Sequence, residues 1–95
     1  MKEKAVIYQI NGIEKESGYE FVSVVLKTKN DTKQVFVVSD EDHQDKYLFR
    51  DLDFLKTIAE EFYKIYQEYD IQEVKTIKGV EVKSFYQAHQ ELELN

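Results

Sequence analysis

A short acidic run at residues 40–45 holds the side chains of this sequence that most suggest chemistry. It reads Asp-Glu-Asp-His-Gln-Asp, and oxygen ligands at the first and third positions are typical of a calcium-binding loop. The pattern then departs from such a loop, because the sixth position is Asp45 rather than glycine and the twelfth is Asp51 rather than glutamate. The run therefore indicates a solvated acidic surface, and we expect no bound metal and no cofactor.

Groups suited to catalysis are scarce elsewhere in the chain. The sequence has no cysteine, which excludes a thiol nucleophile and thiolate metal ligands, and it has two histidines. His43 lies inside the acidic run, and His89 lies in an amphipathic C-terminal segment where a packing or surface role is expected. The sequence shows no glycine-rich phosphate-binding loop, nucleophile elbow or paired-histidine helix motif. We therefore expect a protein that is not an enzyme.

The negative charge is concentrated in the middle of the chain. The formal net charge is −6, from 19 acidic and 13 basic side chains. Residues 40–70 hold ten of the acidic side chains and four of the basic ones, so this segment alone accounts for the net charge. Such a balance argues against a protein that neutralises nucleic-acid phosphates and favours a basic protein partner.

Length and composition predict one small domain spanning residues 1–95. A chain of 95 residues with 42% apolar side chains can form a single hydrophobic core. The N-terminal residues do not form an apolar segment, and no long apolar run follows. We therefore expect neither a signal peptide nor a membrane span, and a cytoplasmic protein.

Three β-strands are predicted in the first half of the sequence, at residues 4–10, 19–28 and 32–39, because these segments are rich in β-branched and aromatic residues. Asn-Gly at 11–12 and Asn-Asp at 30–31 predict turns. A two-residue second turn would pair Val24 with Val37, placing Val22, Val24, Leu26, Val35 and Val37 on one aliphatic face. The opposite face would then carry Phe21, Val25, Phe36 and Val38.

A long amphipathic helix is predicted from about Asp51 or Leu52 to Tyr69. Its apolar side chains fall within one half of a helical wheel, and its charged side chains fill the other half. We expect this helix to cover the aliphatic face of the sheet. The apolar half is wide, so Phe54 and Tyr63 at its two edges should stay partly exposed, and tyrosine suits an interface.

The C-terminal quarter allows two predictions. One is a pair of strands at residues 74–78 and 80–87 with a turn at Lys78-Gly79, and the other is a helix over the final residues. Residues 10–19 and 77–86 share Ile, Gly, Glu, Ser and Tyr at matching positions, which favours strands. The predicted fold class is therefore α+β, with a small antiparallel meander of three to five strands against one long amphipathic helix.

In size, acidity and α+β plan the chain resembles small phage-encoded inhibitors, including anti-CRISPR proteins and inhibitors of uracil-DNA glycosylase. This resemblance implies an acidic nucleic-acid mimic that engages a basic protein, without binding nucleic acid or membrane itself. The leading hypothesis is a non-enzymatic protein-binding module whose carboxylates meet basic groups while two aromatic side chains anchor the partner. The predicted binding residues are Asp40, Glu41, Asp42, Asp45, Tyr47, Phe49, Asp53 and Glu60.

The alternative hypothesis is a homo-oligomeric structural or accessory protein. A homodimer would associate through the apolar sheet face of Phe21, Val25, Phe36 and Val38 if no other part of the chain covers that face.

Overall fold

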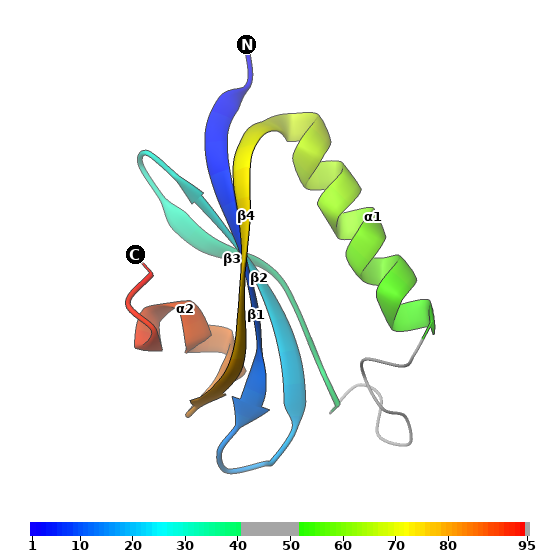
Figure 1. The fold of residues 1–95 in the computed structure, drawn as a ribbon, viewed down its shortest axis with the longest axis vertical. Helices are drawn as coiled ribbons and strands as arrows, with labels where there is room; N and C mark the ends of the chain where they lie inside the picture. Colours follow the sequence, from blue (N-terminus) through cyan, green and yellow to red (C-terminus); the bar gives the residue numbers. More distant parts are fainter. Residues whose placement is uncertain (41–51, 95) are drawn as a thin grey trace.

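A four-stranded β-sheet with helical segments on its two sides forms the α+β framework of the protein (Figure 1). The computed structural model describes residues 1–40 and 52–94. In chain order the elements are β1 (Glu3–Glu14), β2 (Glu20–Thr28), β3 (Thr32–Ser39), α1 (Leu52–Glu68), β4 (Tyr69–Val82), the 3₁₀ helix η3 (Phe85–Gln87) and α2 (Ala88–Glu91). No helix in these described ranges is long and apolar enough to cross a membrane.

The sheet is mixed, with strand order β3-β2-β1-β4. β1 pairs with β2, and β2 with β3, in antiparallel fashion, as the meander prediction required. β4 instead pairs with β1 in parallel, so the prediction of a purely antiparallel sheet was wrong. The physical reason is the connection, because the chain leaves β3 at one edge and returns through α1 to the opposite edge, and a parallel pair requires such a crossover.

Asn11-Gly12 and Lys78-Gly79, the two pairs predicted to form turns with glycine, lie inside strands. β1 continues through Asn11 and Gly12, and the chain turns only later, where the N–H of Gly18 donates to the carbonyl of Glu14 at 2.8 Å. β4 likewise runs through Gly79, which has a φ of 71° and is the extra residue of a β-bulge facing Asn11 and Gly12. The predicted turns at these two sites were wrong. Gly12 and Gly79 lie instead at a β-bulge in the pairing of β1 with β4.

The C-terminal quarter combines parts of both predictions. One strand, β4, replaces the two predicted strands and ends at Val82, and a helical segment follows at residues 85–91. The first parts of the matching segments, residues 10–14 and 77–82, pair in the sheet, with Ile10 directly opposite Ile77. The two similar segments therefore belong to neighbouring parallel strands and do not form a hairpin.

The register of the β2–β3 hairpin differs from the prediction. Lys27 pairs with Thr32, so the turn is wider than two residues, and a bulge between Val24 and Val25 shifts the register again. As a result Val24 pairs with Phe36 rather than with Val37. Because side chains alternate along a strand, this shift moves Phe36 to the α1 side of the sheet and Val37 to the other side.

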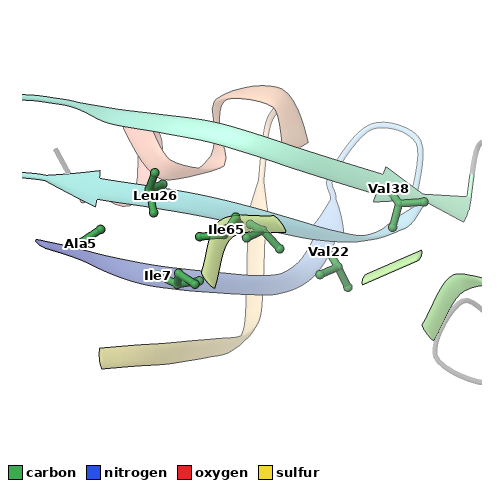
Figure 2. Close-up of a cluster of buried hydrophobic side chains, with 7 residues drawn as sticks. Ala5, Ile7, Val22, Leu26, Val38 and Ile65 are labelled. Atoms are coloured by element: carbon green, nitrogen blue, oxygen red, sulfur yellow. The ribbon is translucent and has the colours of Figure 1, made fainter. Parts of the chain in front are cut away.

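Two apolar clusters cover the two faces of the sheet, which Figure 1 shows edge-on between α1 and α2. The α1-side cluster, drawn in Figure 2, consists of Ala5, Ile7, Val22, Val24, Leu26, Val38 and Ile65. The α2-side cluster consists of Ile10, Phe21, Val25, Val82, Phe85 and Ala88. β1 and β2 contribute to both clusters, which accounts for the apolar side chains that these two strands carry on both faces.

Candidate functional site

Helix α1 buries only part of its apolar side against the sheet. Among its described side chains Ile65 is the buried one, at 7% exposure, and Ile58 and Phe62 are partly buried against the α1-side cluster. The prediction that the helix covers the sheet face therefore holds for one narrow row of side chains. Leu55 and Tyr63, by contrast, are 46% and 65% exposed.

The exposed apolar side chains of α1 lie in one line along the helix. Leu55, Ala59 and Tyr63 follow one another at intervals of four residues, and Tyr66 comes three residues later. Side chains at these spacings are neighbours on a helix surface. We call this set, Leu55, Ala59, Tyr63 and Tyr66, the tyrosine stripe. All four residues are exposed, so α1 presents a second apolar surface beside the row that packs on the sheet.

The polar side of α1 is acidic but partly neutralised. Lys64 Nζ lies 3.4 Å from a carboxylate oxygen of Glu61, one turn away. Glu60 and Glu68 are exposed and form no ion pair within the described ranges. Lys56 is exposed on this side as well, so the polar side chains described from residue 55 onward carry three carboxylates and two ammonium groups.

A shallow depression of about 440 Å³ continues the tyrosine stripe at the carboxyl end of α1. It lies where α1 passes directly into β4, since Tyr69 begins the strand immediately after the helix. Lys2 reaches this place from the start of β1, and its Nζ donates to the carbonyl oxygen of Tyr66 at 3.2 Å. The lining residues are Met1, Lys2, Tyr66, Tyr69, Asp70 and Ile71.

Charges of both signs surround this depression, because Lys2 and Asp70 both line it. The last carbonyls of a helix lack intrahelical partners and carry the negative end of the helix dipole. The last turn of α1 contains no basic side chain to offset it, and Glu68 and Asp70 add two carboxylates. Asp70 makes no ion pair with any described residue, although Lys4 lies opposite it in the β1–β4 register.

The predicted partner-binding residues are distributed over different parts of the chain. Glu60 is exposed on α1, and Asp53 lies in the first turn of that helix with its side chain outside the described part. Five others fall in residues 41–51, outside the described residues: Glu41, Asp42, Asp45, Tyr47 and Phe49. The prediction for these five therefore stays a prediction.

Asp40 has a structural role at the start of β2. Its Oδ2 accepts a hydrogen bond from the N–H of Glu20 at 3.2 Å. Its Oδ1 is buried and has no hydrogen-bond partner among the described residues. This carboxylate is turned into the fold and is only partly available to a partner.

The four residues predicted to form an apolar oligomer face lie on opposite sides of the sheet. Phe21 and Val25 are fully buried in the α2-side cluster, where the Phe21 ring lies 6.0 Å from the ring of Phe85. Phe36 and Val38 pack in the α1-side cluster. The shift in hairpin register separates them, so the prediction of one shared face was wrong.

Two carboxylates hold the C-terminal segment over the α2-side cluster through hydrogen bonds. Glu91 accepts hydrogen bonds from the N–H groups of Lys83 and Ser84 at 2.8 and 3.1 Å, and Glu14 accepts one from the N–H of Phe85 at 3.2 Å. The N–H of Lys83 in particular lowers the pKa of Glu91 below its ordinary value. Three successive backbone donors at the start of η3 are thereby satisfied.

The described residues contain no group of three or more His, Cys, Asp or Glu side chains placed to hold a metal ion. His89 is 6% exposed within the C-terminal segment, which agrees with the packing role expected for it. The sequence analysis did not predict that Leu55, Tyr66 and Asp70 are exposed. For Leu55 and Tyr66, the unusual width of the apolar half of the helix could have indicated this exposure.

Fold and surface together define a small α+β protein with a mixed sheet and an exposed apolar helix surface. Comparison with protein-family models, with curated proteins and with solved structures finds no match to this chain.

Proposed function

We propose that this protein is a non-enzymatic protein-binding module that engages a basic partner protein through α1. The exposed tyrosine stripe carries this proposal. Tyrosine supplies a large apolar surface with a polar tip, and it is enriched where proteins bind one another. In this proposal α1 is the long amphipathic helix that the sequence predicts. One row of its apolar side chains packs on the sheet, and the tyrosine stripe contacts the partner.

The charge distribution supports a basic partner. Residues 40–70 carry the whole formal net charge of −6, and the exposed Glu60 and Glu68 of α1 belong to this segment. An acidic surface attracts a basic protein and orients its approach, which raises the association rate. In the sharper form of the proposal the protein is a small phage or mobile-element inhibitor, and these carboxylates take the places of nucleic-acid phosphates.

Affinity capture with matched tyrosine variants tests the proposal. The wild-type protein, a Tyr63→Ser variant and a Tyr86→Ser control would each be immobilised and exposed to a lysate of the source cells. Tyr63 and Tyr86 are 65% and 61% exposed, but Tyr86 lies in η3, away from α1. We expect one basic protein to bind the wild type and the control and to be released by salt. Loss of the Tyr63 ring should weaken its binding about ten-fold, as for a tyrosine at the centre of an interface.

Two outcomes would contradict this function. Equal retention of the basic protein by both variants would remove α1 from the interface. Recovery of the protein itself alone, together with a stable dimer in sedimentation, would favour self-association instead. Thermal melts of the three proteins check that each variant is folded.

A further inference from the structure

Strand β4 leaves one edge of the sheet open. It is the last strand in the order β3-β2-β1-β4, so it pairs with β1 on one side and with no described strand on the other. Figure 1 shows this strand between α1 and α2, which lie on the two faces of the sheet. Residues 72–76 of β4 are all exposed. The N–H and C=O groups that point outward along such an edge can pair with a further strand.

The open edge of β4 is long and partly regular. β4 has 14 residues, whereas β3, at the opposite edge of the sheet, has 8. Two bulges in β4, at Gln72 and Gly79, lie on either side of residues 73–78, which pair with β1 without interruption. Natural edge strands are protected by proline, by bulges or by charged side chains. Residues 73–78 contain no proline, and their charged side chains are of both signs, so their effect depends on what lies opposite.

This regular stretch is complementary to itself in antiparallel orientation. If Val74 lies opposite Val74 of a second copy, then Glu73 of each copy lies opposite Lys75 of the other. Residues directly opposite each other in an antiparallel pair lie on the same face, and opposite charges at such positions stabilise the pair. One register therefore forms two ion pairs, one on each side of the central valines.

The two faces of β4 fit this arrangement. Lys75 lies opposite Tyr8 of β1, on the α2 side, and its Nζ is 3.8 Å from a carboxylate oxygen of Glu73. Val74 lies opposite Ile7, on the α1 side, and is 42% exposed. A second copy would bring the same two charges to the edge in reverse order, giving four side chains of alternating sign. It would also cover the exposed part of Val74.

The charges disfavour the nearest alternative registers. Sliding one copy by two residues keeps both faces aligned, but it places Glu73 opposite Glu73 or Lys75 opposite Lys75. Like charges directly opposite each other destabilise a strand pair. In the register centred on Val74, by contrast, Lys78 comes next to the second copy's Asp70, beyond the bulge. The charged side chains of β4 therefore select one register.

We propose that the protein forms a homodimer in which β4 pairs with β4 of a second copy, antiparallel and centred on Val74. The two four-stranded sheets then form one continuous sheet. This surface is different from the apolar sheet face of the alternative hypothesis, whose residues the fold places on opposite sides. A single pair of edge strands is a small interface, so we expect a weak dimer with a Kd on the order of 100 µM.

Sedimentation equilibrium of charge variants tests the dimer. The wild type should change from monomer to dimer between about 10 µM and about 1 mM. Lys75→Glu and Glu73→Lys should each raise the Kd about ten-fold, because each replaces both ion pairs by like-charge pairs. The two side chains are 48% and 56% exposed, so both variants should fold, and thermal melts check this.

Two combinations should restore the pairing. The double variant Glu73→Lys/Lys75→Glu exchanges the two charges and should dimerise like the wild type. An equimolar mixture of the two single variants should form a heterodimer, because one chain then offers only positive charges at these positions and the other only negative ones. Lys33→Glu, at an exposed position on β3, changes the net charge as Lys75→Glu does and should leave the Kd unchanged.

A wild type that is still a monomer at about 1 mM would overturn the β4 dimer. A Kd that both single variants leave unchanged, or a mixture of them that does not associate, would overturn it as well. These failures are separate from failure of the proposed function, because a β4 dimer is compatible with capture of a basic protein through α1. Absence of a captured basic protein would remove the proposed function and leave the dimer in place.

Discussion

Replacing Gly12 with alanine should destabilise the protein by about 3 kcal/mol, because β4 passes this residue without room for a side chain. A Cβ at Gly12 would lie 2.4 Å from the carbonyl oxygen of Val80 and 2.6 Å from Val80 Cγ2. It would also lie 3.1 Å from Phe21 Cε1. A carbonyl oxygen belongs to the backbone and cannot rotate away, so β4 would have to move by about 1 Å and lose part of its pairing with β1.

Thermal and urea denaturation followed by circular dichroism measure this effect. For a domain of this size, a loss of 3 kcal/mol corresponds to a fall in Tm of roughly 12–24 °C. Gly18→Ala and Gly79→Ala are the controls, because both glycines have positive φ, at 72° and 71°, and nothing lies within 4 Å of an added Cβ. Their cost is set by backbone conformation alone, at about 1 kcal/mol.

The comparison among the three glycines decides whether close strand packing is the cause. If Gly12→Ala costs no more than the two controls, β4 does not approach β1 as closely as argued, and the reasoning fails. A change in the urea m-value for Gly12→Ala alone would point instead to an altered native or denatured state.

Two further predictions concern the C-terminal segment and α1. Glu91→Gln should cost about 1 kcal/mol at neutral pH, because the carboxylate holds the N–H groups of Lys83 and Ser84. These bonds lower the pKa of Glu91 from its ordinary 4.5, so its contribution is present above that value and is lost as the pH falls through the lowered pKa. Urea denaturation across this pH range should therefore show wild type and variant converging in acid, and a constant gap would contradict the role of the carboxylate. Ile65→Ala should cost about 2–3 kcal/mol in the same assay, and Leu55→Ala less than about 0.5, because the first side chain is buried and the second is 46% exposed. Equal costs would mean that α1 packs on the sheet through a different row.

The segments of the sequence with strong local patterns were well predicted. β2 and β3 match the predicted strands to within a residue, and the described structure has a helix, α1, in the segment where helical periodicity occurs. β-branched runs and helical periodicity are local properties, so they can be read without knowledge of the fold. Turn signals were less informative, since Gly12 lies where β4 approaches β1 closely and Gly79 lies in a β-bulge, and the chain reverses at neither residue.

Pairing and surface exposure depended on contacts between distant residues. The bulge that moves Phe36 to the α1 side has no signal in the hairpin sequence, and the parallel docking of β4 depends on where α1 returns the chain. For the candidate site, the wide apolar half of the helix predicted the exposure of Tyr63. The depression beside Tyr66 was not predictable, because Lys2 and Asp70 meet there only after β1 and β4 pair.

The parallel pairing of β1 with β4 also constrains the order in which the protein can fold. Glu3 pairs with Tyr69 and Ile10 with Ile77, so each pair closes a loop of more than sixty residues. The β1–β2 and β2–β3 hairpins close much shorter loops and carry a smaller entropic cost before their contacts form. During synthesis β1 therefore stays an open edge of the sheet until residues 69–82 have emerged, and β4 is the strand that completes the sheet.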